Sequence, residues 1–160
     1  MRQLVAIVFA DMAGYTALMQ ENELLAKSKR KRVKEVFDAT IEKYHGKILQ
    51  YYGDGSLSIF KSAIDAVNCA VNIQHQLLQS PKVDLRIGIH TGDVSVEDES
   101  IYGDGVNIAS RVESLAVAGS VFISEKVYDE IKNQDYIQAK ELGFFELKKI
   151  QPAVLLHREG

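Results

Sequence analysis

Two aspartates stand where a strand-like part of the sequence gives way to glycine. Asp11 ends the apolar run 4–10, shortly before Gly14, and Asp54 lies between two glycines. Carboxylate oxygens are ligands that Mg²⁺ and Mn²⁺ prefer, and a strand fixes where each carboxylate sits. Glycine lets backbone N–H groups approach a phosphate closely. The pattern therefore indicates a divalent-metal site that acts on a phosphorylated substrate.

Each aspartate also has an ordinary structural explanation. Asp11 could cap the helix that follows it, and residues 53–55 are common hairpin-turn chemistry. The pair is more informative, because if the first strand and this hairpin are sheet neighbours, both carboxylates lie at the same end. A bound divalent cation would relieve their repulsion. Two metal ions there would clamp the attacking and leaving oxygens of a phosphoryl transfer, and the helix start after Asp11 would offer N–H donors to a triphosphate.

A second polar pair lies on the helix that we expect over residues 104–116. Asn107 and Arg111 are about 40° apart on this helix. The apolar stripe falls on the opposite side, at Ala109, Val112 and Ala116. A solvated helix face is the alternative explanation. Flexible glycines at the helix start permit close approach of a ligand or a second chain, and arginine suits charge that develops on a phosphoryl group.

The elements that must position these residues alternate between strands and helices. We expect strands at 4–10, 47–52, 56–60, 85–90 and 121–123, a turn at 91–93, and a strand at 93–96 that continues or pairs with the one before it. We expect helices at 21–44, 63–78 and 104–116, one more capped by Ser124, and a closing hairpin from 142–147 and 153–157. The order predicts an α+β sheet with helices on one face.

Composition narrows the class of protein. With 160 residues, 46 % of them apolar, and two prolines, the chain is expected to form one globular domain over 1–160. The net charge of −3 argues against a nucleic-acid partner. Cys69, the single cysteine, is expected to be buried and inert. No signal peptide or membrane-length apolar run is apparent, so we expect a cytoplasmic domain without direct membrane contact, alone or within a longer membrane- or sensor-linked protein.

Three segments together resemble the catalytic domain of class III adenylate and guanylate cyclases. They are residues 9–16, 51–56 and 102–111, and the resemblance runs over almost the whole chain. The resemblance implies a ferredoxin-like core of βαββαβ type with additional strands and helices. It also implies a homodimer with the active sites at the interface between the subunits.

The resemblance further implies a role for each residue. Asp11 and Asp54 would bind two Mg²⁺ or Mn²⁺ ions in one subunit. From the other subunit, Asn107 would orient the ribose and Arg111 would stabilise the transition state at the α-phosphate. The ribose 3′-hydroxyl would attack the α-phosphorus and release pyrophosphate, with a metal ion lowering the pKa of that hydroxyl. Further substrate contacts are expected from Met12, Ala13, Gly14, Tyr15, Thr16 and Lys148.

The residues expected to contact the base leave its identity open. Active adenylate cyclases of this family usually have lysine three residues before the hairpin glycine, where this chain has Gln50, and the partner position is Ser100. The Gln50 amide both donates and accepts hydrogen bonds, so it could pair with adenine or guanine. We expect ATP to be favoured over GTP. The alternatives are a guanylate cyclase, a weakly active or inactive nucleotide-binding dimerisation module, and a purely structural interaction domain.

Two further positions depart from the family. Only residues 94–100 separate the expected turn from the helix that carries Asn107, where many members have a longer arm that embraces the partner. Asp93 stands where some members have a phosphate-binding arginine. We therefore expect a shorter arm and the loss of that phosphate contact.

Overall fold

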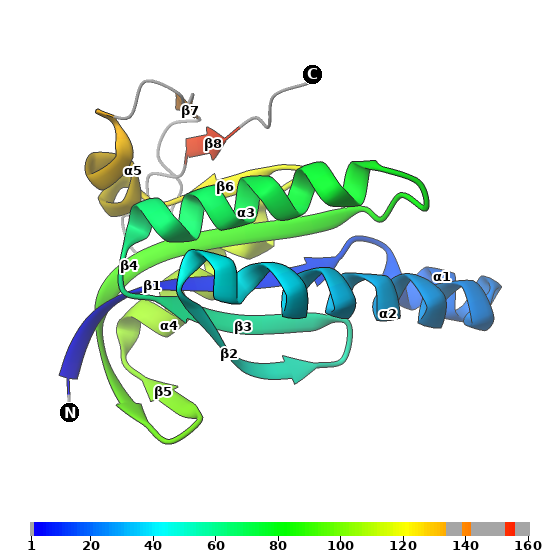
Figure 1. Cartoon of the computed structure of the whole chain (residues 1–160), viewed down its shortest axis with the longest axis horizontal. Coiled ribbons are helices and arrows are strands. Elements are labelled where there is room, and N and C mark those ends of the chain that lie inside the picture. Colours follow the sequence, from blue (N-terminus) through cyan, green and yellow to red (C-terminus); the bar gives the residue numbers. More distant parts are fainter. Residues whose placement is uncertain (1, 134–138, 142–152, 156–160) are drawn as a thin grey trace.

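One twisted sheet forms the centre of the domain in the computed structural model, which describes residues 2–133, 139–141 and 153–155 (Figure 1). Its strand order is β2-β3-β1-β4-β6-β8-β7, with β5 paired to β4, and all pairings are antiparallel except β4 with β6. The strands are β1 (Arg2–Met12), β2 (Gly46–Tyr52), β3 (Gly55–Phe60), β4 (Leu85–Glu97), β5 (Ser100–Tyr102), β6 (Val121–Ile123), β7 (Ala139–Glu141) and β8 (Ala153–Leu155).

Helices cover both faces of this sheet. They are α1 (Tyr15–Glu21), α2 (Glu23–Thr40), the 3₁₀ helix η1 (Ile41–Tyr44), α3 (Ala63–Leu78), α4 (Asp104–Leu115) and α5 (Glu125–Ile131). Along β1, Ala6 and Val8 belong to the core beneath α2 and α3, whereas Val5 and Ile7 belong to the core beneath α4. The expectation of helices on one face is therefore wrong. A central strand that is apolar on both faces needs a cover on each.

The helix expected over 21–44 is present as α2 and η1 and begins just after Asn22, where the short helix α1 has ended. Asn22 adopts an extended backbone (φ −154°, ψ 88°), and its side chain accepts a hydrogen bond from the Leu25 N–H at 3.1 Å. Asparagine is a preferred N-cap, so this residue ends α1 and starts α2. At its C-terminal end, α2 is followed directly by the 3₁₀ helix η1. This helix ends at His45, whose φ is 65°.

The turn expected at 91–93 is absent, because β4 continues through it. β1 pairs with β4 from Arg2 opposite Ser95 to Met12 opposite Leu85. This unbroken ladder holds Thr91 and Gly92 in extended conformation and also makes β1 longer than its apolar run. The arm that follows is short, as predicted, with only β5 returning along the end of β4.

Other expected features agree with the structure. The helix 63–78 and the strand 121–123 have the predicted bounds. Cys69 is buried, and burial raises the pKa of its thiol to about 12. β7 and β8 pair antiparallel, and β8 falls within the second expected strand of the closing hairpin; the first expected strand, 142–147, lies outside the described residues. In the part of the chain that the structure describes, no helix is long and apolar enough to cross a membrane.

Ser124 takes the N-cap position of α5 but uses its hydroxyl elsewhere. Its side chain makes no capping bond, and its Oγ lies 2.7 Å from Nδ1 of His90. His90 is 5 % exposed, and burial, with a smaller effect from Lys126, lowers the pKa of the imidazole to about 4. The fold therefore holds His90 in its neutral form near neutral pH.

Because the folded pKa of His90 lies below its unfolded value, its contribution to stability is complete above about pH 6.5 and is lost as the pH falls towards 4. We expect the free energy of unfolding to fall by about 2 kcal/mol more in the parent than in His90→Gln between pH 7 and pH 4.5. Urea titrations at both pH values measure this difference. Equal losses in the two proteins would show that His90 is not the titrating group.

Candidate active site at the end of the sheet

The two predicted aspartates meet at one end of the sheet. Asp11 stands near the end of β1, opposite Gly55 of β3, and Asp54 forms the turn between β2 and β3. Oδ2 of Asp54 accepts a hydrogen bond from the Met12 N–H at 3.1 Å. The strand and the hairpin are therefore sheet neighbours, as predicted. Asp11 does not cap α1, whose N-cap is Gly14 with φ 72° and no side-chain bond.

Arg86 of β4, which the sequence reasoning missed, binds Asp11 directly. Its Nε donates to Oδ1 at 2.9 Å and its Nη2 donates to Oδ2 at 3.0 Å. The pair forms because Asp11 and Arg86 stand opposite each other in the β1–β4 register. This planar, two-bond geometry is the strongest form of an arginine–carboxylate contact. The signal in the sequence was a lone cation within an otherwise apolar strand.

Glu113 of α4 completes a charged cluster around Arg86. Its Oε2 lies 3.7 Å from Nε of Arg86, and its side chain is 8 % exposed. Burial, reinforced by the Asp11 charge, raises the pKa of Glu113 to about 7. Tyr52 borders the same cluster, since burial and the charges of Glu113, Asp11 and Asp54 raise the pKa of its phenol. The signal for Glu113 was a charge on the apolar stripe of α4.

Gly88 explains how Glu113 comes so close to the sheet. A Cβ built on Gly88 would lie 2.3 Å from the backbone nitrogen of Glu113. No other residue type fits there without moving α4, because such a contact is far inside van der Waals distance. Because Gly88 has no side chain, α4 can pack directly against β4, and this contact determines the distance between the helix and the sheet.

Asn107 and Arg111 lie on the other side of α4. Asn107 is exposed and Arg111 is half-buried, whereas Gly105, Ala109, Val112 and Glu113 are buried. Within the described residues, Arg111 makes no hydrogen bond or ion pair, and no such contact joins Asn107 or Arg111 to Asp11 or Asp54. Lys148, the other predicted cation of the site, lies outside the described residues.

The predicted phosphate-binding segment Met12–Thr16 is partly occupied by the protein itself. The Met12 N–H binds Asp54, and the Ala13 N–H donates to the Asp84 carbonyl at 2.9 Å. Gly14 turns the chain, and Leu18 N–H makes the first bond of α1 back to its carbonyl. Tyr15 and Thr16 lie in the first turn of α1, where N–H groups have no acceptor within the helix. Donors for a ligand therefore lie at the later residues of this segment.

A β-bulge in β2 decides where Gln50 points. The register of β2 against β3 shifts between Ile48 and Gln50, so that Gln50 pairs with Leu57, whose side chain belongs to the core beneath α4. Opposite residues in a sheet share a face, so Gln50 faces the α4 side together with Leu49. Regular alternation counted from Ile48 would have placed it on the other face.

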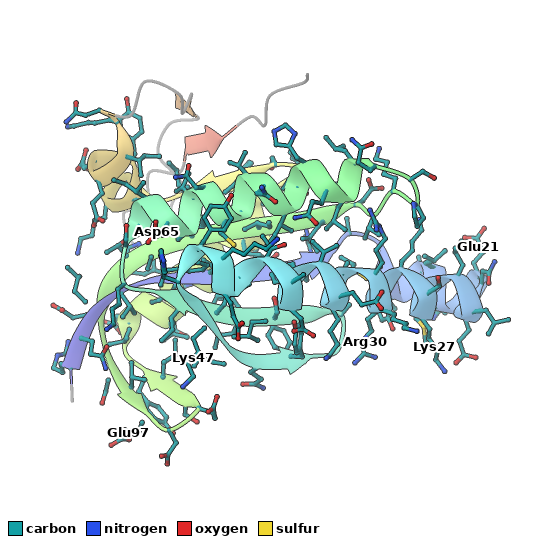
Figure 2. The ribbon with its side chains drawn as sticks, in the orientation of Figure 1. Glu21, Lys27, Arg30, Lys47, Asp65 and Glu97 are labelled. Atoms are coloured by element: carbon teal, nitrogen blue, oxygen red, sulfur yellow. The ribbon has the colours of Figure 1, made fainter. Side chains whose placement is uncertain are left out.

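Ser100 lies close to this part of β2. Leu49 and Ile101, the neighbours of Gln50 and Ser100, share one core cluster. Nζ of Lys47 lies 3.7 Å from Oε1 of Glu99, and Figure 2 shows Lys47 directed towards the β4–β5 arm. The structure thus brings the two predicted base-contacting residues into one region of the fold, and both are exposed.

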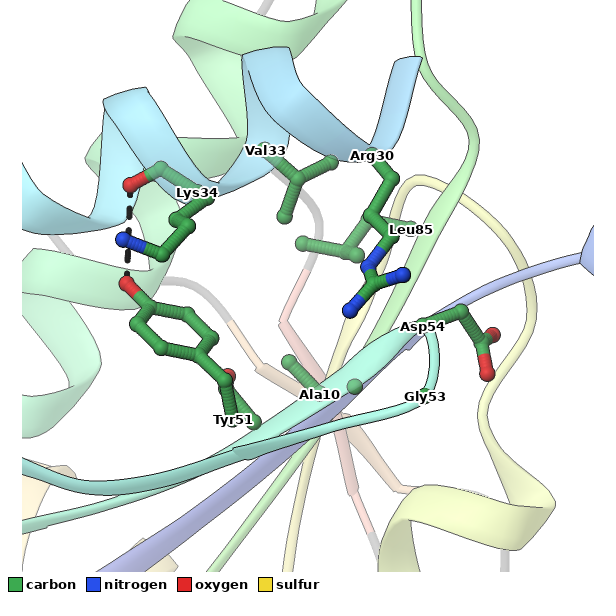
Figure 3. Close-up of a pocket in the computed structure, with 10 residues that line it drawn as sticks. Ala10, Arg30, Val33, Lys34, Tyr51, Gly53, Asp54 and Leu85 are labelled. Atoms are coloured by element: carbon green, nitrogen blue, oxygen red, sulfur yellow. Dashed lines mark hydrogen bonds between the residues drawn. The ribbon is translucent and has the colours of Figure 1, made fainter. Parts of the chain in front are cut away.

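The cavity beside Asp54 is too small for a nucleotide. It has a volume of about 60 Å³, whereas ligand pockets usually have several hundred. Figure 3 shows Arg30 and Lys34 reaching over it from α2, with Asp54 and Gly53 at its rim. A nucleotide near Asp54 would therefore lie on an open surface of this chain unless a second chain covers it.

The chemistry of the two aspartates suits a hard divalent cation. Each carboxylate has about four acceptor positions, and the bonds from Arg86 and from the Met12 N–H use only some of them. Among the described residues, no group of three or more His, Cys, Asp or Glu side chains could hold a metal ion. Mg²⁺ is commonly bound by one or two carboxylates together with water and substrate phosphates, so the residues present fit such an ion.

Comparisons with known proteins identify the family. Residues 1–155 match the family model described as the adenylate and guanylate cyclase catalytic domain, and the chain belongs to this family. A Rhizobium meliloti protein named "Putative adenylate cyclase 3" is 35 % identical over 96 % of this chain, which spans 27 % of that relative's length.

Two solved structures share the fold. The adenylate/guanylate cyclase/hydrolase from Silicibacter pomeroyi is 32 % identical, with a TM-score of 0.85 and coverage of 98 % of both chains. The non-canonical dimeric guanylyl cyclase domain of the RhoGC fusion protein from Blastocladiella emersonii is 25 % identical, with a TM-score of 0.86 and coverage of 99 % of both chains. The class III cyclase fold predicted from the sequence is confirmed.

We expect Gly88→Ala to lower the free energy of unfolding by about 2 kcal/mol, because the added methyl group must push α4 away from β4. Urea unfolding measures the loss. Ser110→Ala, on the exposed side of α4, is the matched control and should change stability by less than about 0.5 kcal/mol. Equal stabilities of the two variants would mean that α4 does not depend on this contact.

Proposed function

We propose that this domain is a nucleotide cyclase that converts ATP, in preference to GTP, to the 3′,5′-cyclic nucleotide and pyrophosphate. The site would be shared between two copies of the chain. The proposal rests on the observation that the predicted site residues form two separate pairs. Asp11 and Asp54 meet at the end of the sheet, whereas Asn107 and Arg111 lie on the side of α4 that faces away from that sheet. This separation supports a site that two copies of the chain complete together.

In the proposed reaction, the ribose 3′-oxygen forms a bond to the α-phosphorus, and the bond from that phosphorus to the bridging oxygen of pyrophosphate breaks. Asp11 and Asp54 would hold two Mg²⁺ or Mn²⁺ ions. Bound there, the ions supply Lewis acidity that eases loss of the hydroxyl proton and neutralise phosphate charge. Arg111 of the second copy would donate hydrogen bonds to the α-phosphate oxygens, and Asn107 would orient the ribose.

Substrate positioning would come from residues on the same sheet end and the α4 side. The N–H groups of Gly14, Tyr15 and Thr16, with Lys148, would bind the triphosphate, next to Met12 and Ala13. Gln50 and Ser100 would read the base edge, because the bulge turns Gln50 to the α4 side. The name of the Rhizobium relative supports adenine, whereas the Blastocladiella structure is a guanylyl cyclase domain, so GTP is the alternative substrate.

A catalytically inactive dimerisation module is the second candidate. Gln50, in place of the family's usual lysine, favours it. Retention of Asp11, Asp54, Asn107 and Arg111 favours the enzyme, because a module that only binds has no need of all four. The two candidates differ in whether nucleotide is turned over.

We expect Asp54→Asn to lower cyclic nucleotide formation at least about 100-fold, because a carboxylate that holds metal is lost. Its thermal midpoint should remain near that of the parent, since an asparagine oxygen can still accept the Met12 N–H bond. Product is quantified by chromatography from ATP and from GTP, each with Mg²⁺ and with Mn²⁺. Asp129→Asn on α5 is the control and should turn over like the parent.

Three results would contradict parts of this proposal. Turnover of Asp54→Asn equal to that of the parent would contradict the metal role. Cyclic GMP as the main product would overturn the choice of base and keep the mechanism. Absence of product from the parent, at a concentration where dimers are demonstrated, would favour the inactive module.

We also expect that Arg111→Ala and Asp54→Asn, each inactive alone, regain activity when mixed. Half of randomly mixed dimers contain one of each chain, and each of these has one intact site of two, so the mixture should reach about a quarter of parent activity. Differently tagged chains, purified together through both tags, establish that mixed dimers are present. Lack of activity in such dimers would contradict a shared site.

A further inference from the structure

Arg86 occupies the place on Asp11 that a cation would otherwise take. Its two hydrogen bonds, of 2.9 and 3.0 Å, cover one edge of the Asp11 carboxylate, and the two side chains are 33 % and 20 % exposed. Neighbouring carboxylates that are partly buried repel each other unless a positive charge lies between them. Arg86 lies within ion-pair distance of both Asp11 and Glu113, so its charge relieves the repulsion between these two carboxylates.

Glu113 holds Arg86 in this position from the other side. Its carboxylate lies 3.7 Å from Nε of Arg86 and is buried beneath α4, so it does not reach the solvent for its own stabilisation. The close packing of α4 on Gly88 fixes the backbone of Glu113 against β4. The guanidinium is thus held between one carboxylate that is a predicted metal ligand and one that is not.

A divalent cation on the free positions of Asp11 would lie close to the Arg86 charge. Two positive charges within a few ångströms of each other oppose binding, and partial burial weakens the screening by water. The phosphates of a nucleotide would offset this repulsion by bringing negative charge into the same space. The arrangement therefore disfavours free metal and favours metal that arrives together with a triphosphate.

We propose that Arg86, supported by Glu113, is a positioning residue that substitutes for the divalent cation on Asp11 in the nucleotide-free protein and keeps the affinity for free metal low. This inference rests on the proposed function, since it requires Asp11 to be a metal ligand. It adds that binding of metal and nucleotide is coupled: the site binds a metal ion together with nucleotide more readily than it binds a metal ion alone. Because Arg86 and Glu113 carry opposite charges, removing one charge or the other should change the affinity for free metal in opposite directions.

The test is the affinity of the full chain for Mn²⁺ alone, measured without nucleotide by the paramagnetic resonance signal of free Mn²⁺ at about pH 8. Arg86→Gln removes the competing charge and should bind Mn²⁺ at least about tenfold more tightly than the parent. Glu113→Gln leaves Asp11 as the one carboxylate paired with Arg86 among the described residues, removes a negative charge from the cluster, and should bind Mn²⁺ several-fold more weakly. Lys132→Gln, which loses a cation paired with Asp129 on α5, is the matched control and should bind like the parent.

Thermal unfolding gives a second measurement that does not depend on turnover. In EDTA, Arg86→Gln should unfold at a lower temperature than the parent, because Asp11 and Glu113 have lost the cation that is paired with both of them. Mn²⁺ should raise its midpoint more than it raises that of the parent, since a ligand stabilises the folded state in proportion to its affinity. A merely structural arginine would lower stability in both conditions alike.

The failures of the two proposals are distinguishable. If the parent binds Mn²⁺ and Arg86→Gln binds it equally or more weakly, Arg86 is structural and only this inference fails. If neither protein binds Mn²⁺ into the millimolar range, or if Asp54→Asn binds it like the parent, the metal site of the proposed function fails as well. If Arg86→Gln does not fold, Glu113→Gln decides, and unchanged or tighter binding by that variant overturns the inference.

Discussion

Three carboxylates gathered at one end of a sheet repel one another, and the domain must hold them there before any substrate binds. It does so with one guanidinium from the neighbouring strand and with backbone geometry. The antiparallel register of β1 and β4 places Arg86 opposite Asp11, and the tight β2–β3 turn brings Asp54 to the Met12 N–H. The length of β4, which continues through the expected turn, is part of the same solution, because a break there would release the register.

Helix α4 lies between the carboxylate cluster at the end of the sheet and the exposed side that carries Asn107. Its inner side carries Glu113 against Arg86, and its outer side carries Asn107 and Arg111. A rigid helix that rests on Gly88 transmits any displacement of one side to the other, because its backbone is already in contact with β4. In the proposed dimer, each α4 would serve its own carboxylates and its partner's substrate at once.

Short-range signals were sufficient for most of the fold and for half of the site. The apolar run before Asp11, the Gly-Asp-Gly turn and the stripe of α3 each specify an element by local rules, and the structure confirms them. Arg86 and Glu113 were missed because their roles depend on strand register and on helix height, which are set by residues far away in the sequence. The bounds of α1 were missed for a different reason, since this short helix buries none of its residues and therefore shows no apolar stripe.

The bulge in β2 separates the half of the strand that carries the expected base contact from the half that follows η1. One extra residue lies between Ile48 and Gln50, so that Gln50 and Leu49 share the α4 side. Because Gln50 pairs with Leu57 on the hairpin side of the bulge, loss of the extra residue would restore regular alternation and leave Gln50 on the same face. Variation in the length of β2 before position 50 would therefore leave the expected base contact in place, whereas substitution at position 50 would change it directly.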